Sequence, residues 1–357
     1  MNIYVLDASF QVVAVLDNYS SVIWTTRFYT YGDFELCVPA SENMLNTLKA
    51  GRYLVRDFDM VGNVYSHVMT IYDRHIQTDA ENGDMLIVTG KDQKAILERR
   101  VISSQTVLNG TVAACVEALL NVTIIEPTDT DRAIPHFLFN HITPSGQLAQ
   151  QMKKQVTGKN LAEAVAEICE TYGVGYDVTI DNGYWIFSIF EGTDRSYDQS
   201  VFPYVVFSAG FDNLLSCNYS ERLENYANVC YVAGEGEGSS RKIAKVGDVA
   251  GLYRFECWED ARNASTNGGT ITDETYMEQL AEDGAAVLSE REKTVTMDGE
   301  LSQDGSFMLN RDYYLGDVVQ VDAGCGITAK TRVIEVIESE DATGVQIIPT
   351  FSEMEVN

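Results

Sequence analysis

Apolar and polar residues alternate along most of the first hundred positions, and short turn sequences separate the alternating runs. A period of two places successive side chains on opposite faces of a strand, so each run predicts a half-buried β-strand. One run, from Phe34 to Val38, follows a Gly-Asp turn sequence and ends at Pro39. The predicted strands are residues 2–6, 11–16, 22–29, 34–38, 53–58, 65–78 and 85–89. Together they predict a first β domain over residues 1–102.

The pattern changes to a helical period in the next hundred residues. Apolar side chains recur at Leu161, Val165, Ile168 and Cys169, which is the i, i+4, i+7, i+8 spacing of one helix face. A similar helix is predicted over residues 111–120, and a hairpin follows the second helix over residues 175–190. This combination predicts an α+β insertion domain over residues 103–203.

Strand patterns return from residue 204 to the end of the chain. One long helix interrupts them at about residues 270–292, with Thr272 as its N-cap and acidic residues in its first turn. The sequence therefore predicts a second β domain over residues 204–357 with an inserted helix. The expected fold class is mainly β with α+β insertions.

Charge narrows the possible functions of this fold. The 357 residues include 53 acidic and 25 basic side chains, which gives a net charge of −28. Binding to nucleic acid by phosphate neutralisation needs a basic stripe, and the longest basic runs here are pairs such as Lys153-Lys154. The same charge disfavours an anionic membrane surface. No apolar run reaches the roughly 18–20 residues of a transmembrane helix, so no membrane anchor is expected.

The seven cysteines include no CxxC pair, and the N-terminus lacks the pattern of a signal peptide. Both features suit synthesis in a reducing cytoplasm. Four of the cysteines lie in apolar strand patterns and are expected to be buried free thiols: Cys37, Cys217, Cys230 and Cys257.

Candidate chemistry is sparse. The sequence contains four histidines, His67, His75, His136 and His141, and none has a neighbouring Cys or Glu at metal-ligand spacing. GxSxG, HExxH and GxxxxGK[ST] motifs are absent. We therefore expect no catalytic residues, no cofactor and no metal site.

Several motifs nevertheless occur in a fixed order, from W-x-x-R-x-Y-x-x-G-D-F-E-L-x-V-P near the N-terminus to IIPTFS near the C-terminus, and together they resemble one family, the tail-hub proteins of siphophages. The first is the N-terminal signature W-x-x-R-x-Y-x-x-G-D-F-E-L-x-V-P, carried here by Trp24, Arg27, Tyr29, Gly32, Asp33, Phe34, Glu35, Leu36 and Pro39. Further similar segments are GKDQKAILERRVI (90–102), NYANVCYVAGEGEG (225–238), YRFECWEDAR (253–262), YYLGDVVQV (313–321) and IIPTFS (347–352). Their matching residues include Asn228, Gly234, Glu256, Asp260, Arg262, Gly316 and Asp317.

The resemblance implies a structural protein of the virion tail tip rather than an enzyme. Its fold would be shared with the central hub of contractile phage baseplates, with two tube-like β-barrel domains and helix-containing accessory domains in each protomer. Three protomers would form a homotrimeric ring that continues the tail tube and lets DNA pass. The implied partners are a hexameric distal tail protein, the tape measure protein, and a fibre, spike or hydrolase on a separate chain. The motif residues would have structural roles.

Two alternatives from other functional classes remain. A tail-tip hydrolase of cell wall or glycan would need a catalytic pair that the motif search does not find. A carbohydrate-binding receptor module could use some of the tyrosine, phenylalanine and tryptophan side chains, but most of them lie at strand-core positions.

Overall fold

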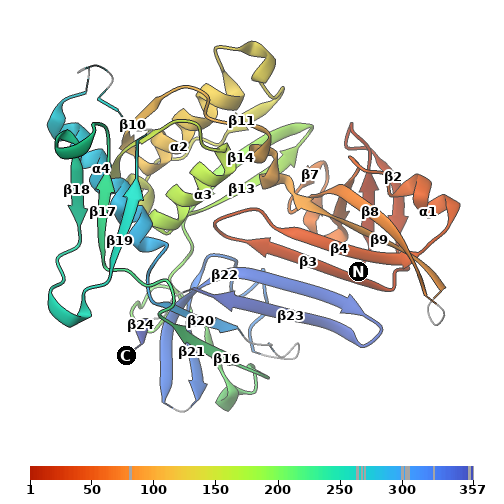
Figure 1. Cartoon of the computed structure of the whole chain (residues 1–357). Coiled ribbons are helices and arrows are strands. Elements are labelled where there is room, and N and C mark those ends of the chain that lie inside the picture. The colour runs from red at the N-terminus through yellow and green to blue at the C-terminus, as the bar shows by residue number, and fades with distance from the viewer. Residues whose placement is uncertain are drawn as a thin grey trace.

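Strands dominate the fold, and the longest of them form one 14-stranded sheet. The computed structural model (Figure 1) describes residues 1–79, 83–262, 265–266, 268, 271–298, 301, 306–324, 326–352 and 355–356. The large sheet contains β1 (Ile3–Leu6), β2 (Val12–Leu16), β3 (Ser21–Arg27), β4 (Asp33–Pro39), β5 (Tyr53–Arg56), β8 (Met69–Asp79), β9 (Gly83–Asp92), β15 (Val206–Ser208), β16 (Asn218–Arg222), β20 (Thr294–Asp298), β21 (Val318–Gly324), β22 (Ile327–Asp341), β23 (Gly344–Phe351) and β24 (Glu355–Val356).

Three smaller sheets and four α-helices complete the architecture of the residues that the structure describes. The sheets are β10 (Thr106–Thr111) with β12 (Gln151–Val156); β11 (Phe137–Phe139), β14 (Tyr184–Phe190), β13 (Gly175–Asp181), β7 (Val64–Tyr65) and β6 (Met60–Val61); and β18 (Ile243–Val246), β17 (Val229–Ala233) and β19 (Glu256–Asp260). The helices are α1 (Glu42–Thr47), α2 (Val112–Leu120), α3 (Leu161–Tyr172) and α4 (Asp273–Ser289). A mainly β fold with α+β insertions is thus confirmed.

The large sheet runs continuously from the C-terminal half into the N-terminal half of the chain. Strand β22 pairs antiparallel with β3, from Glu335 opposite Arg27 to Asp341 opposite Ser21. Figure 1 shows β22 and β23 on one side of this junction and β3 and β4 on the other. The resulting order is β16-β20-β23-β22-β3-β4-β9-β8, followed by β5-β1-β2.

The helices of the α+β part begin and end where the sequence predicts. The Asn160 side chain accepts a hydrogen bond from the Ala162 N–H at the start of α3, and Gly173 ends the helix with a positive φ of 64°. Helices α2 and α3 share one apolar core with the adjoining strands, and Tyr176 and Phe187 stack within it at a ring-centroid distance of 5.3 Å.

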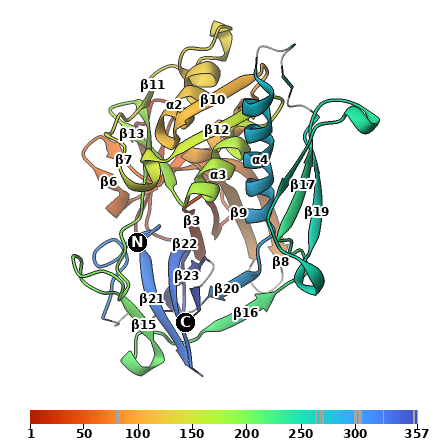
Figure 2. The same ribbon diagram turned by 90° about the vertical axis from the view of Figure 1, so that its left-hand side faces the viewer.

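Helix α4 covers the small sheet β18-β17-β19 and also faces α3 (Figure 2). Tyr276 and Leu280 of α4 form a separate apolar core with Cys230 and Val232 of β17. On the side toward β12 and α3, the contacts of α4 are polar, including a hydrogen bond of 3.2 Å from the Tyr172 hydroxyl to Glu282. We call β17–β19 and α4 the α4 module.

The structure corrects two sequence-based expectations. The predicted strand over residues 65–78 is broken at His67, whose φ is 46°, so Tyr65 pairs with Ile180 in the α+β part while β8 starts only at Met69. Among the cysteines expected to be buried, Cys230 is buried, whereas the other three are partly exposed: Cys37, Cys217 and Cys257.

Domain boundaries at residues 102/103 and 203/204 stay a prediction. The apolar cores give them context, because one core uses residues from Ile3 to Val88 and another uses residues from Val205 to Phe351. The β6–β7 hairpin, however, lies before residue 102 and pairs with β13 of the α+β part.

Candidate assembly site

The N-terminal signature residues meet at the β3–β22 junction. Arg27, the last residue of β3, places its Nε 2.6 Å from Glu335 of β22 and its Nη1 2.5 Å from Asp33 of β4. Both carboxylates are partly exposed, so the electrostatic gain of each pair is modest in water. Together, the two pairs connect the end of β3 to the start of β4 and to the middle of β22.

Gly32 is required here by close packing. Its backbone N–H donates to the Asp92 carboxylate over 2.6 Å, and a Cβ at this position would lie 2.0 Å from the carbonyl oxygen of Thr25. Burial raises the pKa of Asp92, although Lys94 and the Gly32 N–H act in the opposite direction. From the sequence, Gly32 is expected to serve the turn through its backbone flexibility. In the structure, Gly32 is required because the backbone of β3 passes too near for a side chain.

Signature residues with apolar side chains form the core face of the same strands. Trp24 and Phe34 are buried opposite each other with ring centroids 5.9 Å apart, and Leu36 is buried beside them. Glu35 and Pro39 are exposed on the other face of β4. Tyr29 leaves the sheet and packs against the α+β core, where burial raises the pKa of its hydroxyl.

Arg56 supports this core face and was not identified from the sequence. Its guanidinium is buried, lies 5.0 Å from the ring centroid of Trp24, and contacts Asp59 and Glu338 at 2.5 Å each. A buried guanidinium needs such partners, because an unpaired charge in the interior is costly. The run YLVR offers no signal for this role, since the residue ends an ordinary apolar strand.

Phe28 connects the first β half to the rest of the molecule and was likewise missed. A Cβ at Gly175 or at Gly316 would lie 2.2 Å from its ring, so the ring fits between two glycine backbones. The Arg332 guanidinium lies 5.3 Å from the centroid of this ring. Gly316, a signature residue, also has a φ of 93°, a conformation that favours glycine.

Asp317 next to Gly316 binds a neighbouring loop. Its buried carboxylate accepts hydrogen bonds from the Thr193 N–H at 2.7 Å, from Arg195 Nε at 2.6 Å and from the Tyr314 N–H at 3.0 Å. These bonds hold the segment that leaves β14 against the start of β21.

The matching residues of the segments 225–238 and 253–262 lie in the α4 module, apart from the junction. Asn228 binds the backbone of Tyr253 and Phe255, and Gly234 is so near Tyr276 that a Cβ would lie 2.2 Å from the hydroxyl oxygen. Glu256 pairs with Arg254, and Asp260 pairs with Arg262 and Arg241. The structure thus brings the signature residues together in two groups, both made of packing and ion-pair contacts.

Two strands of the large sheet, in addition to the terminal strand β2, have an outer edge that pairs with no described strand over most of its length. Strand β5 pairs with β8 only at Met69 and Thr70, and residues 72–78 of β8 are exposed along their whole length. At the opposite end, β16 pairs with β20 and with no other described strand. An unpaired edge presents free N–H and C=O groups and is a template for pairing with another chain.

Neither a metal site nor a membrane span is found in the described part of the chain. No group of three or more His, Cys, Asp or Glu side chains there could hold a metal ion. None of the helices there is long and apolar enough to cross a membrane.

Comparison with known proteins agrees with this architecture. The sequence matches the family model described as Siphovirus ReqiPepy6 Gp37-like protein over residues 2–351, and no curated protein matches it. Three solved structures share its fold. The 43 kDa tail protein of prophage MuSo2 from Shewanella oneidensis is 14% identical, with 99% of this chain and 98% of that chain covered and a TM-score of 0.57. A tail protein from Neisseria meningitidis MC58 is 12% identical, with 98% of this chain and 96% of that chain covered and a TM-score of 0.58. Prophage tail protein gp18 from Listeria monocytogenes EGD-e is 12% identical, with 98% of this chain and 94% of that chain covered and a TM-score of 0.53. The resemblance to siphophage tail proteins is therefore confirmed, and the chain belongs to the Siphovirus ReqiPepy6 Gp37-like protein family.

Proposed function

We propose that this protein is a structural hub of a phage tail tip, in which three copies form a ring that continues the tail tube. The observation that carries the proposal is the pair of unpaired edges at the two ends of the run β16-β20-β23-β22-β3-β4-β9-β8. The family and the tail-protein fold support a role in the phage tail.

Residues 72–78 of β8 are exposed, and their outer edge pairs with no described strand, so this edge is open to a strand of a neighbouring copy. If residues 72–78 of β8 pair with β16 of the next copy, the contact is heterologous. Repeated contacts of this kind close into a three-membered ring when each copy is rotated by one third of a turn from the last. Tyr72 and Ile76 are exposed on this stretch and would be covered by the neighbour. The run from β16 to β8 would then continue from one copy into the next around the ring.

The open face of the same sheet suits a channel that passes DNA without binding it. Glu35 and Asp341 are exposed there, while two basic side chains on this face are neutralised: Arg27 by Asp33 and Glu335, and Lys91 by Glu98 at 2.8 Å. Acidic groups repel phosphate, and at physiological salt this acts over a Debye length of about 8 Å. A hexameric distal tail protein above the ring and the tape measure protein are the partners that we propose.

The edge model is tested by changing β8 in the full-length chain. Mass photometry and negative-stain imaging should find ring-shaped trimers for the unchanged protein and monomers for Tyr72→Lys/Ile76→Lys, because lysines block strand addition. The matched control Val61→Lys/Val201→Lys places two lysines at other exposed positions and should still form rings. A protein that remains monomeric at micromolar concentration, even with the distal tail protein, would contradict the proposal.

A further inference from the structure

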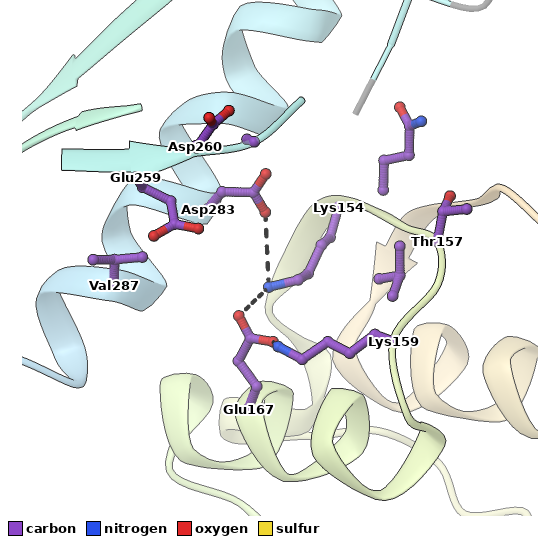
Figure 3. Close-up of a pocket in the computed structure, with 11 residues that line it drawn as sticks. Lys154, Thr157, Lys159, Glu167, Glu259, Asp260, Asp283 and Val287 are labelled. Atoms are coloured by element: carbon purple, nitrogen blue, oxygen red, sulfur yellow. Dashed lines mark hydrogen bonds and ion pairs between the residues drawn. The ribbon is translucent and has the colours of Figure 1, made fainter. Parts of the chain in front are cut away.

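A polar pocket of about 190 Å³ lies where the α4 module meets the α+β part (Figure 3). Strand β12 and helix α3 form one wall, and β19 and α4 form the other. The polar residues that matter here are Lys154, Gln155, Thr157, Glu167, Glu259 and Asp283.

Ammonium groups of the protein already occupy one side of this pocket. Lys154 Nζ lies 2.7 Å from Glu167 and 3.8 Å from Asp283, and Lys159 also pairs with Glu167. Burial alone would raise the pKa of Glu167, but the two lysines lower it below its ordinary value. Glu167 is therefore an ionised and well-compensated carboxylate.

The other side of the pocket carries negative charge without a matching cation. No ammonium or guanidinium of the described residues lies within ion-pair distance of Glu259, and the contact of Lys154 with Asp283 is long. Figure 3 shows Glu259 and Asp283 on adjacent elements, on the same side of Lys154. Burial raises the pKa of Asp283 to about 6. The negative charges of Glu167 and Glu259 raise this pKa further, whereas the positive charges of Lys154 and Lys159 lower it.

Unpartnered polar atoms line the same space. Both amide atoms of Gln155 are buried without a hydrogen-bond partner among the described residues, and the whole residue is only 7% exposed. The hydroxyl of Thr157 is buried and unpartnered as well. Leaving such groups unsatisfied in the interior is costly, so these atoms are available to hydrogen-bond a polar ligand.

We propose that this pocket binds a primary ammonium group, with Glu259 and Asp283 as its counter-ions and Gln155 Oε1 as a hydrogen-bond acceptor. The lysine contacts with Glu167 show that the pocket accommodates this group. An ammonium has three donors and no acceptor, which matches a wall of carboxylate, amide and hydroxyl oxygens. An anion is disfavoured, because Glu167, Glu259, Asp260 and Asp283 outnumber the two lysines.

The test is calorimetric titration of the full-length protein at pH 7.5 and fixed ionic strength. Putrescine represents a free diamine, Nα-acetyl-lysine methylamide represents a lysine side chain of a partner protein, and 1,4-butanediol is the uncharged control. We expect saturable binding of one amine per chain and no binding of the diol. The tighter of the two amines identifies the source of the ammonium.

Variants separate the pocket from the general negative charge of the protein. Glu259→Gln/Asp283→Asn should weaken binding at least tenfold, whereas Glu163→Gln/Glu274→Gln removes two exposed carboxylates from α3 and α4 and should leave it unchanged. Gln155→Leu removes an amide that has no hydrogen-bond partner among the described residues, so it should weaken binding without unfolding the chain. Equal weak binding by both double variants, or no saturable binding of either amine, would overturn the proposal.

The pH dependence provides an independent readout. Binding needs the ionised form of Asp283, so affinity should fall as the pH drops through about 6. Lys154, Lys159, Glu167 and Glu259 face this carboxylate, and its replacement in Asp283→Asn should flatten the profile between pH 5 and 7.5. An unchanged profile in that variant would contradict the assigned role of Asp283.

Discussion

The ring of Phe28 lies against the backbone of Gly316, and a Cβ on that glycine would be 2.2 Å from the Cε2 atom of the ring. Because Phe28 directly follows β3 and Gly316 precedes β21, this contact joins the two β halves at a point remote in sequence. It packs without the space for even one methyl group.

Gly316→Ala should therefore be strongly destabilising. Its φ of 93° strains any other residue, and the clash with Phe28 adds to that strain, so we expect a loss of roughly 2–5 kcal/mol in the free energy of unfolding. Urea unfolding measures this loss. Gly51→Ala is the matched control, since the φ of Gly51 is a similar 83°. A Cβ on Gly51 would have no atom of another described residue within 4 Å, apart from its two chain neighbours. It should lose only about 1–2 kcal/mol, and equal losses would refute the role of the Phe28 contact.

Gly32→Val should impair both folding and assembly. The φ of Gly32 is ordinary, so the cost comes from the 2.0 Å approach to the Thr25 carbonyl and from the disturbed hydrogen bond to Asp92. We expect a loss of about 3 kcal/mol or more in the free energy of unfolding, measured with urea. Gly210→Val, where a Cβ meets only the Ser208 hydroxyl at 3.4 Å, should be nearly neutral. Normal rings formed by Gly32→Val would show that this close approach is dispensable.

Arg56→Met should cost about 3–5 kcal/mol of the free energy of unfolding, because it removes the guanidinium from two poorly hydrated carboxylates. Among the described residues, Glu338 then has no cation within ion-pair distance, and Asp59 keeps only His67. The triple variant Arg56→Met/Asp59→Asn/Glu338→Gln removes the stranded charges as well. It should unfold at a higher urea concentration than Arg56→Met alone. If the triple variant is no more stable than the single one, the buried charges are not the source of the loss.

His67 should make stability depend on pH. Burial alone would lower the pKa of His67, but the hydrogen bond of 2.9 Å to Asp59 and its negative charge raise it above the ordinary value. A raised folded-state pKa contributes stability that is fully present below the unfolded value of about 6.5. That contribution is lost as the pH rises through the folded-state pKa.

We therefore expect the free energy of unfolding to fall between pH 6 and pH 8.5 more in the unchanged protein than in His67→Asn. The lowered pKa of Asp59 keeps this carboxylate ionised over the whole range, despite the opposing effect of its burial. Urea unfolding at several pH values checks the difference. Parallel curves for the two proteins would exclude His67 as the responsible group.

Local elements could be predicted from the sequence because their signals are local. Helix α4 begins after its predicted cap, where the Thr272 hydroxyl accepts a hydrogen bond from the Thr275 N–H at 3.3 Å. Helix α3 and the Gly173 cap follow the apolar spacing in the same way. Such elements depend on residues within one or two turns, which a single sequence contains in full.

The junction and the pocket depend on residues distant in the chain, and the alternation of residues does not encode their partners. Nothing near Arg27 identifies Glu335 as its partner, and nothing near Lys154 identifies Asp283. The ordered motifs identified the family but assigned Gly32 to turn flexibility rather than to packing. Phe28 and Arg56 look like ordinary strand residues, so their positions could be found only from the structure.

Pairing of β3 with β22 also has a consequence for synthesis. Arg27 and Glu335 are 308 residues apart, so β3 leaves the ribosome long before its partner strand exists. During translation one edge of β3 therefore stays unpaired until β22 has been synthesised. Contacts between residues so far apart in sequence also form slowly. A nascent chain that stalls before residue 327 would therefore be open to misassembly or degradation. Only chains translated through β22 can form the complete run of strands from β16 to β8.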